Sequence, residues 1–378
     1  MRRWLFLLAI LLGLLALAAC AAEKQTTPAP TGAALATPAA WEQEWERVLA
    51  AAKREGKVAV IGPPGADVRR ALTEPFQRKY GITVEYLPAR GGEIASRLQA
   101  ERDAGQYLWD LHIGSPTYVF TLFGPMKALE PLEPALILPE VKDGQNWRGG
   151  KLPMVDKDGF SLAMSKYVTE AFYYNTNLIK AGEIKSYRDL LDPKWKGKIM
   201  ALDPTILGSG DAKFAFFYLH KDLGPEFIRA LARQEILITR DYNQIAEWLA
   251  TGKYAISIGG DKNVIAPMTK AGAPLTSYDS KQMKEGGSIH VGLTGLMPFN
   301  RAPHPNAAKV YINWLLTKEA QTEYSRATGL PSSRADVPTD HVDPFYLPVE
   351  GYIPLDGEDG TKLRTERLQP FLKEVLAQ

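Results

Sequence analysis

The sequence predicts an α/β protein of two lobes, and its length and alternating pattern support that prediction. The 378 residues suffice for two domains, and 45% hydrophobic with 23% charged residues are ordinary globular values. Short apolar segments of strand length alternate along the chain with segments whose apolar residues recur at helical spacing. This alternation favours right-handed crossovers and largely parallel sheets, in which ligands bind beyond the carboxyl ends of the strands.

The N-terminal residues predict export and a lipid anchor. Residues 1–19 combine Arg2 and Arg3 with an apolar stretch too short to span a bilayer comfortably, which is typical of a signal peptide. The segment 17–20 (LAAC) is similar to a bacterial lipobox, so we expect cleavage before Cys20 and lipidation of its sulfur. A retained signal-anchor helix is the alternative. Residues 20–40 are small, polar and proline-bearing, and they predict a flexible tether.

The distribution of strand-like and loop-like segments predicts the domain organisation. We expect lobe one to comprise residues 41–124 and 287–330, and lobe two to comprise residues 125–286 and 331–378. A stretch rich in proline and glycine begins at residue 125 and indicates passage between the lobes. Val291–Phe299 reads as a strand that returns to lobe one.

Three expected strands of lobe one each end in a loop, and in a parallel sheet such loops meet at one edge. The loops comprise residues 62–67, 88–93 and 114–118. Arg90 offers a planar fork of donors for a phosphate or carboxylate, and Ser115 and Thr117 offer hydroxyl groups. The candidate ligand-binding residues of lobe one are Arg90, Gly91, Gly92, Glu93, Ser115 and Thr117.

Two strand-to-helix connections of lobe two predict helix N-termini that face a ligand. Ile199–Leu202 reads as a buried strand, and the small residues 208–210 (GSG) then precede a helical face. Tyr254–Ile258 similarly precedes the loop 259–263 (GGDKN). The unpaired N–H groups at such helix starts favour a negatively charged ligand. The candidate ligand-binding residues of lobe two are Ser209, Gly210, Asp211, Asp261 and Lys262.

Each polar candidate also has a plainer interpretation. A hydroxyl or carboxylate at a helix start can serve as a cap, and a charged loop residue can simply be solvated. Arg90 could equally pair with Glu93 at the start of its helix.

No catalytic or metal-binding motif stands out, so we expect neither an enzyme nor a bound cofactor. The sequence lacks a G-x-S-x-G elbow, an H-E-x-x-H pair and a Walker lysine motif, and its five histidines are scattered without metal-ligand spacing. Gly208 and Gly210 begin a dinucleotide-like pattern, but Lys213 stands where the third glycine belongs. Without the signal peptide the chain carries 43 basic and 43 acidic residues, which argues against nucleic acid as a partner.

Four stretches resemble one family of transport proteins. Ser186–Ile199 (SYRDLLDPKWKGKI) resembles a signature of the family 1 extracellular solute-binding proteins of ABC importers. Tyr174–Leu178 (YNTNL), Asn300–Ala308 (NRAPHPNAA) and Leu330–Arg334 (LPSSR) are similar to further motifs of that family, in the same order. The resemblance covers about residues 41–340 and is strongest to the branch of ferric-iron, phosphonate and sugar-phosphate binders.

The resemblance implies a type II periplasmic-binding-protein fold, whose hinge-linked lobes close on a ligand in the cleft between them. It implies capture of a small solute at the extracytoplasmic face of the membrane and delivery to an ABC permease, by a monomer without cofactor. We rank a small anion first, such as a phosphonate, a sugar phosphate or a carboxylate. Ferric ion is the alternative and a small organic cation the third choice. Two hypotheses come from other functional classes: a secreted α/β lipoprotein hydrolase, and a structural lipoprotein without ligand.

Ferric ion fits the sequence less well than an anion. Relatives that bind ferric ion hold it with adjacent tyrosines just after the strand expected at Tyr254–Ile258. No tyrosine pair stands there, and Lys262 would repel a trivalent cation. We assign the adjacent pair Tyr173 and Tyr174 to core packing or ligand stacking.

Overall fold

We describe the protein from a computed structural model, in which residues 39–89 and 91–376 are placed. The expected signal peptide, Cys20 and nearly all of the expected tether lie outside these residues. Within the described part of the chain, no helix is both long enough and apolar enough to cross a membrane.

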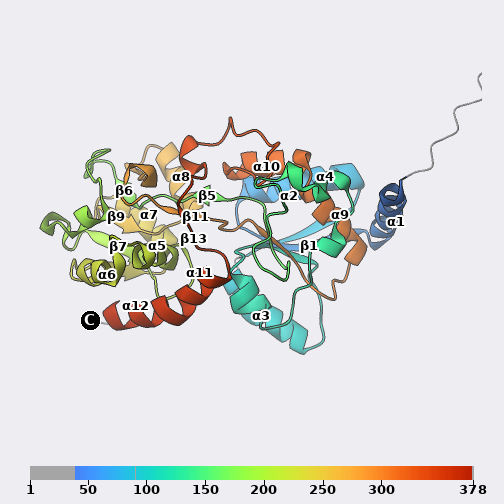
Figure 1. The fold of residues 1–378 in the computed structure, drawn as a ribbon, viewed down its shortest axis with the longest axis horizontal. Coiled ribbons are helices and arrows are strands. Elements are labelled where there is room, and N and C mark those ends of the chain that lie inside the picture. The colour runs from blue at the N-terminus through green and yellow to red at the C-terminus, as the bar shows by residue number, and fades with distance from the viewer. Residues whose placement is uncertain (1–38, 90, 377–378) are drawn as a thin grey trace, which may run out of the picture. The chain divides into compact units, whose positions relative to one another are not determined.

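Lobe one is built around a five-stranded sheet (Figure 1). Its strands in spatial order are β2 (Thr83–Pro88), β1 (Lys57–Gly62), β3 (Leu111–Gly114), β12 (Gly295–Pro298) and β4 (Leu162–Ala163). β1 pairs in parallel with β2 and β3, whereas β12 is antiparallel to β3. The prediction that the chain returns to this sheet within Val291–Phe299 is therefore confirmed.

The helices of lobe one cover this sheet with apolar faces. They are α1 (Ala40–Glu55), α2 (Ala66–Tyr80), α3 (Gly91–Asp103), the short α4 (Pro139–Lys142), α9 (Pro305–Leu315) and α10 (Lys318–Thr328). The Phe76 ring of α2 lies 5.0 Å from the ring of Tyr311 and 5.2 Å from that of Trp314, both in α9. α2 ends at Tyr80 and is capped by Gly81, whose φ of 70° is left-handed and favours glycine.

Lobe two is built around a second five-stranded sheet. Its strands in spatial order are β10 (Leu275–Ser277), β6 (Tyr173–Asn175), β9 (Ile256–Ile258), β7 (Ile199–Leu202) and β8 (Leu237–Thr239). Its helices are α5 (Ser209–Leu219), α6 (Gly224–Ala232), α7 (Tyr242–Ala250), α8 (Lys262–Lys270), α11 (Glu358–Lys362) and α12 (Gln369–Leu376). All four residues of β7 are buried, as their unbroken apolar sequence predicts.

A small third sheet joins segments that are far apart in the sequence. It consists of β13 (Ile353–Pro354), β11 (Ser288–His290) and β5 (Tyr167–Val168). Two π-helical segments, Val119–Phe123 and Leu363–Leu368, and six short 3-10 turns complete the described secondary structure. The turns are Glu133–Ala135, Gly144–Asn146, Tyr187–Leu191, Pro193–Trp195, Ser280–Gln282 and Pro344–Tyr346.

The structure differs from our expectations where the chain passes between the lobes. The strand that we expected over Val168–Tyr174 is two strands in different sheets, β5 and β6. β4 at residues 162–163 belongs to the first sheet, although we expected lobe two to begin at residue 125. Leu132 and Trp147 pack in the same core, because apolar side chains can anchor an irregular segment as well as a helix.

The 3-10 turns of the family-like signature are stabilised by side-chain caps. Ser186 accepts a hydrogen bond from the Arg188 N–H, and Asp189 accepts one from the Ser186 N–H at 3.0 Å. Asp192 then accepts from the Lys194 N–H at 2.9 Å, just before Pro193. These caps give Ser186, Asp189 and Asp192 a structural role in this stretch.

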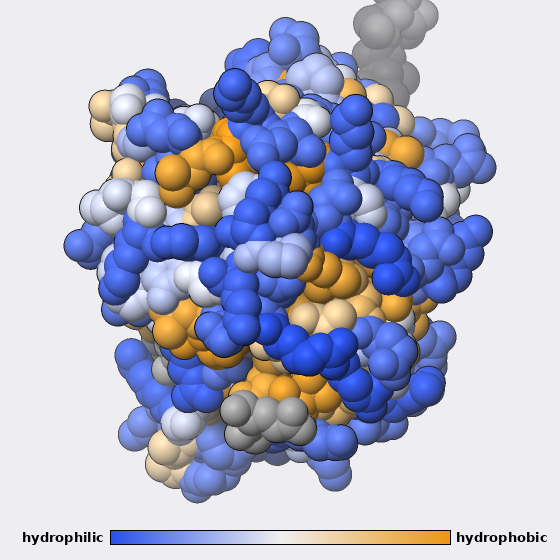
Figure 2. Space-filling model, turned by 90° about the vertical axis from the view of Figure 1, so that its left-hand side faces the viewer, coloured by the Kyte–Doolittle hydropathy of each residue, from blue (hydrophilic) through white to orange (hydrophobic). Residues whose placement is uncertain are grey.

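The face of lobe two seen in Figure 2 is mostly hydrophilic. Hydrophobic residues are exposed on that face in several separate areas rather than in one continuous patch.

Candidate functional site

A cavity of about 280 Å³ lies where the two lobes and the third sheet meet. The carboxyl ends of β1 and β3 bring residues of lobe one to it, and the starts of α5 and α8 bring residues of lobe two. This position beyond strand ends is the one that the topology predicts for a ligand.

The wall that lobe one contributes is uncharged in all of its described residues. Pro63 and Pro64 follow β1, and Ser115, Thr117 and Tyr118 follow β3. The hydroxyl groups of Ser115 and Thr117 lie 2.8 Å apart and hydrogen-bond to each other. This wall can thus offer hydroxyl groups and apolar surface to a solute.

The N-terminus of α5 forms part of the opposite wall. Ser209 lines the cavity, and its hydroxyl donates to the Gly260 carbonyl at 2.8 Å and accepts from the Gly260 N–H at 3.1 Å. A Cβ atom at Gly210 would lie 2.1 Å from the Leu202 carbonyl oxygen, so glycine is required there by packing. Gly210 is not among the residues that line the cavity.

Asp211 lies behind the wall instead of facing a solute. Its side chain is fully buried, and Oδ1 accepts a hydrogen bond from the Gly208 N–H at 2.6 Å. Its two oxygens also accept from Nε and Nη2 of Arg364, at 2.7 and 2.8 Å. The structure therefore places Asp211 as a cap and as the support of an arginine that does line the cavity.

Lys213 is a buried cation in the same wall. Its ammonium group donates to the Thr169 hydroxyl at 2.7 Å and to the Glu170 carbonyl, and lies 3.9 Å from the Glu170 carboxylate. Burial lowers the pKa of Lys213, and the charge of Glu170 opposes that effect. The sequence drew attention to Lys213 only as a departure from a dinucleotide pattern.

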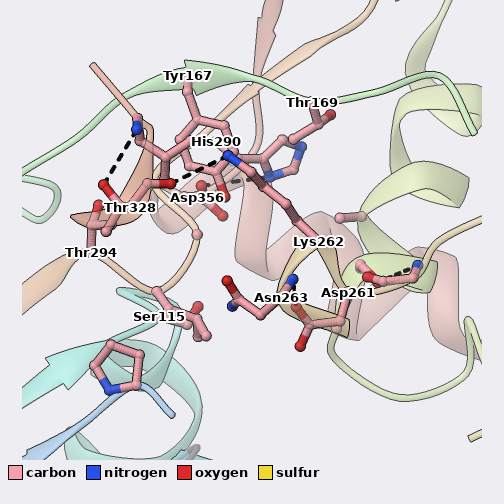
Figure 3. Close-up of a pocket in the computed structure, with 18 of the residues that line it drawn as sticks. Ser115, Tyr167, Thr169, Asp261, Lys262, Asn263, His290, Thr294, Thr328 and Asp356 are labelled. Atoms are coloured by element: carbon pink, nitrogen blue, oxygen red, sulfur yellow. Dashed lines mark hydrogen bonds and ion pairs between the residues drawn. The ribbon is translucent and has the colours of Figure 1, made fainter. Parts of the chain in front are cut away.

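The N-terminus of α8 brings the predicted residues Asp261 and Lys262 to the cavity. Asp261 caps the helix by accepting from the Asn263 N–H at 2.8 Å. Lys262 donates to the Thr328 carbonyl of lobe one at 3.2 Å, and its ammonium group lies 4.0 Å from the centre of the Tyr346 ring. Figure 3 shows Lys262 extended toward Thr328, and in this view Asn263 lies between Asp261 and Ser115. Burial lowers the pKa of Lys262, and nearby carboxylates oppose this.

The third sheet adds titratable groups that we did not predict. Glu170 follows β5, His290 ends β11, and Asp356 follows β13. His290 Nδ1 lies 3.6 Å from Asp356 Oδ2, and Nε2 hydrogen-bonds to the Ser288 hydroxyl at 2.8 Å. Burial alone would raise the pKa of Asp356, but His290 and Arg364 hold that pKa below its usual value.

Of the predicted site residues, five line the cavity: Ser115, Thr117, Ser209, Asp261 and Lys262. Arg90 lies outside the described residues. Gly91, Gly92 and Glu93 begin α3, but their surroundings are also outside the described part. Lys213 could have been found from its position one turn into a helix that faces the cavity, whereas no local pattern marks Arg364.

A metal site is not evident in the described structure. Within residues 39–89 and 91–376, no three His, Cys, Asp or Glu side chains gather as metal ligands would. Tyr173 lines the cavity, whereas Tyr174 packs in the core of lobe two, with its ring 5.3 Å from that of Tyr278. The adjacent tyrosines therefore do not both face the cavity.

The family comparison covers most of the chain. The family described as bacterial extracellular solute-binding protein matches residues 71–345. A periplasmic protein of Salmonella typhimurium, provisionally named as 2-aminoethylphosphonate-binding, is 25% identical over 278 residues. The match spans 71% of this chain and 74% of that relative.

Solved structures share the fold. The periplasmic binding protein AfuA of Actinobacillus pleuropneumoniae, with bound fructose-6-phosphate, superposes with a TM-score of 0.63 at 20% identity, over 85% of this chain and 98% of that one. Iron-bound HitA of Pseudomonas aeruginosa superposes with a TM-score of 0.62 at 17% identity, over 84% and 99%. AfuA is named as a periplasmic binding protein, and the expected two-lobed α/β fold is confirmed.

Proposed function

Because the chain belongs to the family of bacterial extracellular solute-binding proteins, we propose that it captures a small organic oxyanion, with a phosphonate or phosphate ester as the preferred class. The protein is the solute-binding component of an ABC importer. Its relatives are transport proteins that bind solutes, and we propose that it too catalyses no reaction.

The observation that carries the proposal is the meeting of two helix N-termini and two lysines at one cavity. α5 and α8 both begin at its wall, and Lys213 and Lys262 line it. Helix N-termini stabilise negative charge through their free N–H groups and the helix dipole. A cavity of about 280 Å³ suits a small solute better than a polymer.

The carboxylates of the cavity narrow the class further. Glu170, Asp261 and Asp356 line the same space as the lysines, so a solute with negative charge alone would meet repulsion on one side. A solute that carries both an oxyanion and an ammonium group would be matched on both sides. The relative named for 2-aminoethylphosphonate makes an aminoalkylphosphonate the first compound to test.

The third sheet supports a mechanism of capture by closure. Its strands link the lobes beside the cavity, and a solute that contacts both walls stabilises the closed state by its higher affinity for it. The closed form would then deliver the solute to the permease. We place the lobe boundary near residue 165, after β4, and return residues 331–343 to lobe one, because Ser165 pairs with Ser332 there.

We further propose that Cys20 anchors the protein by a lipid at the extracytoplasmic face of the membrane, where it works as a monomer. The lipobox-like segment 17–20 supports this proposal. Replacing Cys20 by Ser should release the mature chain from the membrane fraction. Continued membrane association of Cys20→Ser would instead indicate a retained anchor helix.

Calorimetric titration of the full chain in detergent, without phosphate or chelators, tests the proposed function. The probes are 2-aminoethylphosphonate, fructose-6-phosphate, inorganic phosphate and ferric citrate. Saturable binding of one phosphonate or phosphate ester per chain supports the proposal. Binding of ferric citrate alone, or of no oxyanion, contradicts it.

A further inference from the structure

The C-terminal part of the chain contributes to the cavity although it lies beyond the family match at residues 71–345. After β13 the chain places Asp356 at the cavity, and the π-helical segment Leu363–Leu368 then places Arg364 there. Figure 1 shows this last segment between α11 and α12, in red. The family motifs therefore say nothing about the part that Arg364 plays.

Arg364 is held in one orientation. Its side chain is only 4% exposed, and the paired hydrogen bonds of Nε and Nη2 to Asp211 fix the plane of the guanidinium group. Asp211 is itself fixed by the start of α5, through its bond from the Gly208 N–H. An arginine held in this way does not have to be ordered when a solute arrives.

One edge of the guanidinium group is left without a hydrogen-bond partner. Asp211 occupies the edge formed by Nε and Nη2, whereas Nη1 makes no hydrogen bond. The nearest carboxylate oxygen, Oδ1 of Asp356, lies 3.7 Å from Nη1, which is too long for a hydrogen bond. A buried N–H group without a partner is unfavourable unless something else accepts from it.

The other cations of the cavity already have partners. Lys213 donates to Thr169 and to the Glu170 carbonyl, and Lys262 donates to the Thr328 carbonyl. Among the described cationic side chains of the wall, Arg364 is thus the one with a buried nitrogen, Nη1, that makes no hydrogen bond at all. The edge formed by Nη1 and Nη2 has the planar spacing that fits two oxygens of a phosphonate, phosphate or carboxylate.

We propose that Arg364 anchors the oxyanion of the solute through its unpartnered Nη1, which makes the C-terminal segment part of the solute site. The proposal rests on the proposed function. The carboxylate of Asp356 beside the same donor disfavours a second negative charge. Arg364 and Asp356 together therefore favour a solute whose oxyanion is balanced by its own ammonium group over a free inorganic anion.

Calorimetry with 2-aminoethylphosphonate tests this role in Arg364→Gln and Arg364→Lys. Loss of a charge-assisted paired hydrogen bond should raise the Kd by about 10- to 100-fold in both, because lysine cannot reproduce the planar fork. Arg367→Gln is the matched control, since Arg367 lies in the same π-helical segment and is exposed. Its Kd should stay within about twofold of the wild type.

A double variant separates binding from folding. Arg364→Gln alone leaves Asp211 buried without its partner, so Asp211→Asn/Arg364→Gln removes both charges and keeps an amide pair. If the double variant keeps the wild-type melting temperature and still binds more weakly by about 10-fold or more, the proposal holds. Wild-type affinity in the double variant would overturn it.

A crystal structure of the wild-type chain with 2-aminoethylphosphonate answers the question without any substitution. An oxyanion oxygen within hydrogen-bond distance of Nη1 is expected, and an oxyanion placed elsewhere contradicts the proposal. Failure of the wild type to bind any oxyanion would refute the proposed function itself. Wild-type binding that Arg364 does not influence would refute only the role of Arg364.

Discussion

The two walls of the cavity differ in charge. The described residues of lobe one present hydroxyl groups, prolines and aromatic rings, whereas lobe two and the third sheet present Lys213, Lys262, Arg364 and three carboxylates. Under the proposed function, a charged group of the solute would find its partners in lobe two and the third sheet. Lobe one would complete the site on closure, by covering the solute and excluding water.

The difference follows from the cost of burying charge. An unpaired buried charge is strongly unfavourable, so the charged wall is built from side chains that support one another. Asp211 holds Arg364, Glu170 faces Lys213, and His290 faces Asp356. The uncharged wall needs no such network, and Ser115 and Thr117 simply satisfy each other. Affinity should accordingly be far more sensitive to changes in lobe two.

The largest expected effect is on the fold of the charged wall itself. In Gly210→Ala the new Cβ would lie 2.1 Å from the Leu202 carbonyl oxygen, so the start of α5 must shift and the free energy of unfolding should fall by about 3 kcal/mol. Urea denaturation measures this change. Gly208→Ala is the control, because the nearest atom to its Cβ is 3.7 Å away. Equal stability of the two variants would show that the wall is less tightly built than described.

Lys213→Met should weaken the binding of 2-aminoethylphosphonate by about 2 kcal/mol, because the substitution removes a cation and leaves the Glu170 carboxylate unopposed. Calorimetry measures the loss, and melting temperature reports any change in stability. Lys221→Met, at an exposed lysine after α5, is the control and should bind normally. A Lys213 variant with unchanged affinity would remove that residue from the solute site.

Binding should weaken as pH rises in the range below 10.5. Burial lowers the pKa of both Lys213 and Lys262 below that ordinary lysine value, so each ammonium group loses its proton at a lower pH than an exposed lysine does. The same depression makes the folded state more stable as pH rises through the lowered pKa toward 10.5, since the unfolded chain holds the proton longer. Affinity that stays constant up to pH 10.5 would contradict the involvement of both lysines.

The smallest effect is expected in lobe one. Ser115→Ala removes a hydroxyl that already bonds to Thr117, so affinity should change by about 0.5–1 kcal/mol at most. The same calorimetric series measures it beside Lys213→Met. A Ser115 effect as large as that of Lys213 would abolish the distinction between the two walls.

Local sequence patterns predicted the strands and helices around the cavity better than they predicted which residues line it. Sequence patterns predicted the apolar run of β7, the glycines around the start of α5 and the loop around the start of α8, because strand burial and helix starts leave local signals. The prediction of a single strand over Val168–Tyr174 was wrong. Its residues are apolar enough for one strand, and only the pairing in two different sheets decides that the chain forms two strands there.

The sequence by itself determined the α/β class, the family and the two helix starts that line the cavity, since each depends on neighbouring residues. Tertiary structure decided that Asp211 supports Arg364 from 153 positions away, and that His290 and Asp356 meet at the third sheet. It also decided that Lys262 bonds to lobe one. Such pairings depend on where the folded chain brings distant segments together, and the periodicity of the sequence does not predict those contacts.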